Sequence, residues 1–74
     1  MNGFGEGIVK RMIRGLGVGI IQPKDGGEDV IFSDNVTKGG SQGFNNLGEG
    51  DPVRFREYPE KINGRRFAEE VWPV

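Results

Sequence analysis

The side chains in this sequence that could do chemistry are charged ones, because the groups on which most enzymes depend are missing or scarce. The 74 residues contain no cysteine and no histidine. This removes the thiolate nucleophile, the commonest general base and the commonest transition-metal ligand. Two serines, Ser33 and Ser41, have no histidine to activate them. The sequence therefore predicts a protein that is not an enzyme and that uses no metal or cofactor.

Basic side chains gather near the first predicted strand, where Lys10, Arg11 and Arg14 follow one another closely. A guanidinium group can pair with a phosphate and can also stack on a nucleobase. These residues are therefore candidates for contacts with a phosphate-bearing strand.

A second basic pair, Arg54 and Arg56, alternates with apolar residues on a later strand. We expect this pair to form a solvated strand face that is balanced by Glu57 and Glu60. The formal net charge of the whole chain is −1, which gives no overall attraction to nucleic acid. Any such binding must depend on a local surface.

The glycines between positions 15 and 19 resemble a dinucleotide-binding loop only at first sight. That fingerprint needs a third glycine three residues beyond the second and must open a helix. Here position 20 is Ile20 and a β-branched segment follows. We interpret these glycines as turn and barrel positions.

Short segments rich in β-branched and aromatic residues alternate with turn residues along the chain. No clean helix fits the polar stretch 34–46, and Asn63-Gly64 predicts a turn. The pattern indicates one all-β domain over residues 1–74, either a small barrel or a sandwich. The predicted strands cover residues 8–13, 17–21, 29–33, 52–58 and 67–72.

Alternation within these strands predicts which side chains face inward. The first strand alternates imperfectly, so we expect a bulge there. Ala68 and Val71 differ in parity, which also allows a bulge in the last strand, and we assign Trp72 to packing. The predicted inward residues are Val9, Ile21, Val30, Phe32, Val53 and Phe55.

The order of these segments resembles the bacterial cold-shock domain family. Residues 7–10 (Gly-Ile-Val-Lys), 17–21 (Gly-Val-Gly-Ile-Ile), 29–30 (Asp-Val) and 43–50 (Gly-Phe-Asn-Asn-Leu-Gly-Glu-Gly) fall in the family's order and spacing. The resemblance implies a five-stranded antiparallel OB-fold barrel. It also implies binding of single-stranded RNA or DNA on an aromatic sheet face, where each stacked base contributes about 1–3 kcal/mol.

The sequence departs from this family on the binding face itself. Most aromatic positions of the family hold aliphatic or polar residues here, Phe44 is the one aromatic retained, and Asp34 places a negative charge on the face. Binding should therefore be weaker and more dependent on salt. Alternatively, Phe44 caps the open end of the barrel. The nucleic-acid-binding positions that the resemblance implies are Lys10, Arg11, Met12, Val18, Ile20, Ile31, Ser33 and Phe44.

A second function is compatible with the same residues. If Val18, Ile20 and Ile31 face outward, they form an aliphatic patch beside Arg11 and Phe44. Exposed apolar patches often mark protein contacts. The alternative is therefore a protein-interaction or self-association module, such as a homodimer, on a cold-shock fold.

The sequence also gives an expectation about location. No apolar run approaches the length that spans a membrane, and the first residues lack the pattern of a signal peptide. Together with the absence of cysteine, this predicts a cytoplasmic protein without a membrane partner.

Overall fold

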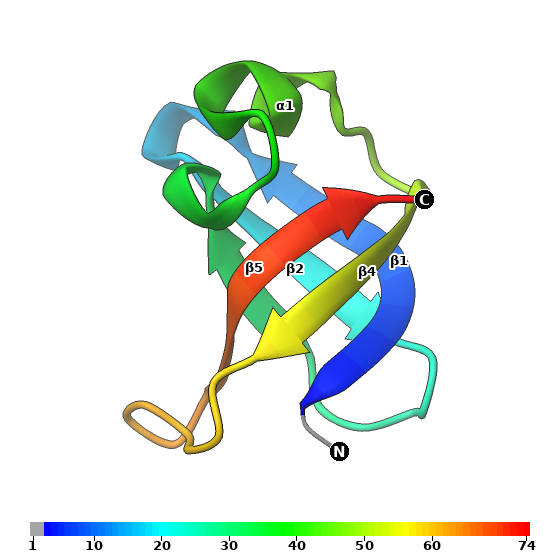
Figure 1. Ribbon diagram of the computed structural model, residues 1–74, viewed down its shortest axis with the longest axis vertical. Helices are drawn as coiled ribbons and strands as arrows, with labels where there is room; N and C mark the ends of the chain where they lie inside the picture. Colours follow the sequence, from blue (N-terminus) through cyan, green and yellow to red (C-terminus); the bar gives the residue numbers. More distant parts are fainter. Residues whose placement is uncertain (1–2) are drawn as a thin grey trace.

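A computed structural model describes residues 3–74 and shows a closed barrel of five strands (Figure 1). The strands neighbour one another in the order β1-β2-β3-β5-β4. The pairing of β3 with β5 is parallel and the other four are antiparallel. The OB-fold-like all-β barrel is confirmed, with one parallel pairing in place of a wholly antiparallel sheet. The strands are β1 (Phe4–Ile13), β2 (Val18–Pro23), β3 (Val30–Ser33), β4 (Pro52–Glu57) and β5 (Arg66–Pro73).

One short α-helix, α1 (Gly40–Asn46), lies over one end of the barrel (Figure 1). It follows a 3₁₀ turn, η2 (Asp34–Val36), and a second 3₁₀ turn, η1 (Arg14–Leu16), joins β1 to β2. The prediction that residues 34–46 contain no helix was wrong. Glycine and asparagine dominate α1 and are poor helix formers, so tertiary packing must hold the helix. A side chain at Gly43 would collide with the carbonyl oxygen of Lys38.

The core lies inside the barrel and under α1. All six predicted inward residues are buried, which confirms the alternation. Four further residues complete the core: Phe44, Leu47, Ala68 and Val71.

Two irregularities in the strand pairing set which side chains point outward. The register of β1 against β2 shifts between Val9 and Arg11, so Lys10 is an extra residue and the predicted bulge is present. The register of β4 against β5 shifts between Arg56 and Glu57. This second bulge allows Ala68 and Val71 both to be buried although they differ in parity.

Arg54 and Arg56 lie on the outer side of β4, as expected. Their ion-pair partners, however, are not the expected Glu57 and Glu60. Arg54 lies 3.4 Å from a carboxylate oxygen of Glu6. Arg56 lies 3.1 Å from Glu69 and 3.0 Å from Glu70. The reason is cross-strand pairing, since β1 and β5 place their acids directly beside β4.

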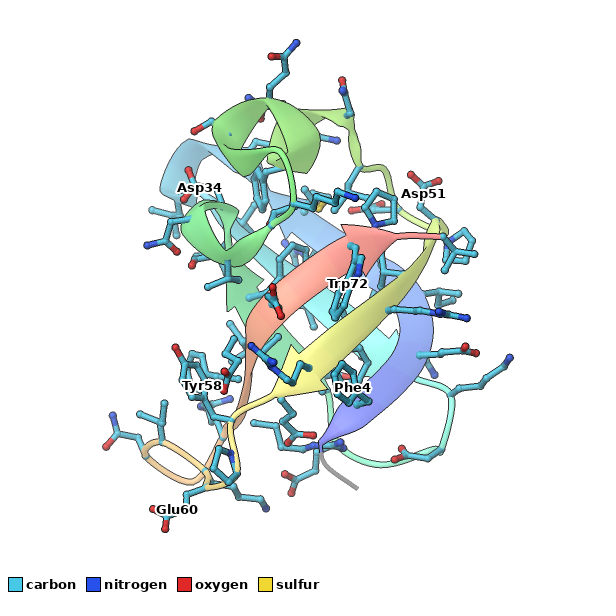
Figure 2. All side chains as sticks on the ribbon, in the orientation of Figure 1. Phe4, Asp34, Asp51, Tyr58, Glu60 and Trp72 are labelled. Atoms are coloured by element: carbon cyan, nitrogen blue, oxygen red, sulfur yellow. The ribbon has the colours of Figure 1, made fainter. Side chains whose placement is uncertain are left out.

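Trp72 packs on this same outer side, as the sequence indicated. Its ring lies 6.1 Å from that of Phe4, and Figure 2 shows both rings beside β4. No helix formed by residues 3–74 has the length and apolar character that crossing a bilayer requires.

Candidate nucleic-acid interface

A continuous row of side chains crosses the outer surface of four strands. Arg11 of β1 pairs with Ile20 of β2, Ile20 pairs with Ile31 of β3, and Ile31 pairs with Phe67 of β5. Their strand neighbours Gly19, Ile21, Val30, Phe32 and Ala68 are buried, so the row points outward. We call Arg11, Ile20, Ile31 and Phe67 the outer row.

A second, shorter row runs beside it towards η1. Ile13 pairs with Val18, and Val18 pairs with Ser33. The Ser33 hydroxyl bonds to the side-chain oxygen of Asn35. The structure therefore brings together five predicted site residues on one surface: Arg11, Val18, Ile20, Ile31 and Ser33.

Two predicted site residues do not lie on this surface. Phe44 is only 2% exposed, and its ring packs edge-on against Phe32 at 5.8 Å. Met12 pairs with Gly19 on the inner side of β2 and packs against the core. Their assignments to the binding face are corrected, because α1 carries Phe44 into the barrel end and the bulge at Lys10 turns Met12 inward. The alternative that Phe44 caps the barrel is confirmed.

Phe67 is a member of the outer row that the sequence analysis did not assign to the site. It is half-buried, and its carbonyl accepts a hydrogen bond from the amide of Tyr58 at 3.0 Å. Tyr58 is 41% exposed and is labelled in Figure 2. The signal was the position of Phe67 next to the inward Ala68, which assigns Phe67 to the opposite side of its strand.

A hollow with a volume of about 570 Å³ adjoins the outer row. Ile20 and Ile31 contribute its aliphatic floor. Two loops form its walls, 27–29 between β2 and β3 and 63–65 between β4 and β5, together with Arg66 at the start of β5. The second loop turns at Asn63 and Gly64, which both have positive φ, so the predicted turn is present.

Arg66 holds one wall of this hollow in place. Its Nε donates to Glu57 Oε2 at 2.7 Å, and its Nη2 donates to Glu57 Oε1 at 2.8 Å. The two side chains are only 16% and 18% exposed. The hydrogen bond to Glu57 raises the pKa of Arg66, although burial opposes this. Arg66 is therefore a structural cation that stays charged.

Other basic residues near the outer row differ in whether they already form an ion pair or a hydrogen bond within the protein. Lys10 is ion-paired to Asp29 at 3.0 Å. Arg14 donates to the carbonyls of Asn45 at 3.2 Å and Leu47 at 2.7 Å, so it fixes the end of α1. Arg11 and Arg65 make no ion pair within residues 3–74 and are exposed.

Acidic groups limit how strongly this surface attracts an anion. Asp34 lies just beyond the end of β3 (Figure 2), and its amide bonds to the carbonyl of Gly17 at 3.0 Å. Glu28 lines the hollow and pairs with Lys61 at 3.0 Å. A ligand must therefore gain affinity from short-range contacts as well as from charge.

Neither the known protein families nor the curated proteins include a match to this sequence. The surface must therefore be interpreted from its own chemistry. It offers an aliphatic strip with a guanidinium at one end, which has no ion-pair partner among residues 3–74, and a ring at the other end. Such a strip can pack against flat apolar rings, while the guanidinium pairs with a phosphate.

Proposed function

We propose that this chain is a cold-shock-like protein that binds single-stranded RNA or DNA on its outer row, with weakened, salt-dependent affinity. One observation carries the proposal. The hollow lies on the outer side of β2 and β3 and beside the loop between β4 and β5. Oligonucleotides bind to OB-folds at these strands and at this loop. The proposed location is the cytoplasm, where proteins rarely form disulfides.

The side chains of the outer row support binding of moderate strength. Phe67 offers one ring for stacking, which contributes about 1–3 kcal/mol per base. Ile20 and Ile31 can bury the face of a second base but lack its π interactions. The exposed Arg11 and Arg65 are available to phosphates. One ring in place of several explains why affinity should be lower than in an aromatic platform.

A titration with a fluorescently labelled strand tests this function. We expect saturable binding of a single-stranded heptanucleotide and binding that is at least about tenfold weaker to a blunt duplex of the same length, because stacking needs unpaired bases. Affinity should fall as salt is raised. Equal affinity for both forms, or no saturable binding of the single strand, would contradict the proposal.

Contact with a protein is the second candidate, and the half-buried aliphatic residues favour it. Ile13, Val18, Ile20 and Ile31 lie together on two paired rows, and such patches often bind proteins. The simplest such contact is self-association with a second copy of this chain. Sedimentation velocity should then show a mass that rises with concentration and that Ile31→Asp returns to the monomer. A concentration-independent monomer that binds the single strand would favour nucleic acid.

A further inference from the structure

The polar groups at the hollow differ in their remaining capacity for hydrogen bonds. Arg66 has little left, because two of its nitrogens bond to Glu57 and Nη1 donates to the carbonyl of Glu28 at 3.0 Å. Asp29 accepts from Lys10 through Oδ2. Its Oδ1 accepts no hydrogen bond from any residue that the structure describes. Asp29 and Glu28 are therefore the open carboxylate acceptors at the hollow, and Asp29 is the less exposed of the two, with 41% of its side chain accessible against 63% for Glu28.

Lys10 and Asp29 together present a donor directly beside an acceptor. The ammonium group has three protons, of which one is directed at Asp29. The ionised carboxylate can only accept. A ligand edge that fits this pair needs an acceptor opposite Lys10 and donors opposite Asp29.

Guanine fits this requirement best among the bases. Its Watson–Crick edge offers the O6 acceptor, followed by the N1–H and N2–H₂ donors. Uracil has a single donor between two acceptors, so one of its carbonyl oxygens would meet the carboxylate. Adenine and cytosine each offer one amino group and no second donor beside it. Carboxylates therefore discriminate in favour of guanine through two adjacent hydrogen bonds.

The geometry points to a base pocket that selects guanine through Asp29, with Lys10 as its companion; this inference rests on the proposed single-strand binding. The base would lie on the aliphatic floor of Ile20 and Ile31, and Asp29 enters the same hollow from the loop before β3. The volume of about 570 Å³ accommodates a nucleotide-sized ligand. Arg65, on the opposite wall and without an ion pair among residues 3–74, is available for the phosphate.

The test compares four labelled hexanucleotides at fixed salt by fluorescence anisotropy. One is all uridine, and the others carry a single central guanosine, inosine or adenosine. Inosine lacks only the N2 amino group, so this comparison does not alter the protein. We expect the strand with a central guanosine to bind about tenfold more tightly than the all-uridine strand, because a bidentate contact contributes about this factor in affinity. The strand with inosine should lose most of this gain in affinity, because it lacks the second donor.

Asp29→Asn is the matching protein variant, and Glu60→Gln is its control. Both remove one negative charge, but Glu60 is exposed, lies in the β4–β5 loop before the turn at Asn63 and Gly64 (Figure 2) and does not line the hollow. Asp29→Asn should bring the ratio of guanosine to uridine affinity close to one, even if freeing Lys10 raises both affinities. Glu60→Gln should leave the ratio unchanged.

The outcomes separate this inference from the proposed function. Equal binding of all four strands by the wild-type protein would overturn guanine selection and leave single-strand binding intact. A guanosine preference that survives Asp29→Asn would overturn the assignment to Asp29. If no strand binds, the proposed function fails and the pocket assignment fails with it.

Discussion

At the scale of single residues, Arg11 and Phe67 lie at the two ends of the outer row. One is a cation without an ion pair among the described residues, and the other is a half-buried ring. Between them lie only aliphatic side chains, which cannot replace rings in stacking. The binding that we propose therefore depends on these two residues more than on any side chain between them.

Arg11→Gln should weaken single-strand binding and reduce the salt dependence. Removing one phosphate contact lowers the slope of log K against log salt by about 0.7 for a single strand. Because Arg11 is exposed and unpaired within residues 3–74, stability should change by less than about 0.5 kcal/mol. Arg54→Gln, on the outer side of β4, is the control, and anisotropy titrations at several salt concentrations measure both. An equal loss of slope in both variants would contradict a local contact at Arg11.

Phe67→Leu should lower affinity by about 1–3 kcal/mol, because leucine fills the site but cannot stack on a base. Phe4→Leu is the matched control, since Phe4 is 63% exposed and lies beside Trp72, away from the outer row. The same titration measures both variants. Unchanged affinity in Phe67→Leu would show that the ring does not contact the strand.

The two phenylalanines also show how far residue-level prediction reaches. Once Ala68 is known to be buried, alternation assigns Phe67 to the outer side of β5, but the sequence left this open because it allowed a bulge in the same strand. Phe44 lies in a segment without period-2 alternation, and its burial depends on where α1 packs. Met12 was assigned wrongly because the bulge was expected but its position was not fixed by the sequence.

At the scale of elements, Arg66 ties three segments together. It bonds to Glu57 at the end of β4 and to the carbonyl of Glu28 in the β2–β3 loop, and it begins β5 itself. A paired, largely buried carboxylate and guanidinium leave an unpaired charge when one partner is changed. The walls of the hollow therefore depend on this pair.

Glu57→Gln should lower the free energy of unfolding by about 1.5–3 kcal/mol, the usual size of a hydrogen bond to a charged group. The charge of Arg66 sets only the alkaline limit of this contribution, because a raised pKa keeps the guanidinium charged at every pH below the ordinary pKa of arginine. The folded pKa of Arg66 is raised, so stability from this group is lost only at strongly alkaline pH. Urea unfolding checks the value, with Glu60→Gln expected within about 0.5 kcal/mol of the wild type.

Gly19→Ala should destabilise the barrel by about 1–3 kcal/mol through overpacking. A β-carbon at position 19 would collide with the ring of Phe32. Gly15→Ala is the matched control, because nothing lies within 4 Å of a β-carbon there and its φ is not positive. We expect Gly15→Ala to be neutral or slightly stabilising. Equal effects in thermal unfolding would contradict the steric explanation.

The strands were predictable because short β-branched and aromatic segments are separated by turn residues, and the second, third and fourth of them also alternate clearly. Both bulges could be anticipated from parity, as with Ala68 and Val71. The helix α1 was not predictable, since Gly40, Gly43 and its two asparagines disfavour a helix in isolation. Its stability comes from contacts with the barrel that no local pattern encodes.

At the scale of the whole molecule, the net charge of −1 means that long-range attraction cannot explain binding. Most basic side chains are already paired with acids, including Lys10, Arg56 and Arg66. Only a local surface with available cations can hold a strand. We therefore propose binding on one side of the barrel and not around its whole circumference.

The direct test of that assignment is an NMR titration of the ¹⁵N- and ¹³C-labelled protein with a short single strand at low and moderate salt. We expect saturable shifts at Arg11, Ile20, Ile31, Arg65 and Phe67, and none at Phe4 or Trp72. The shifts should need more strand at higher salt. No shifts at millimolar strand, or shifts confined to the surface around Phe4 and Trp72, would contradict binding at the outer row.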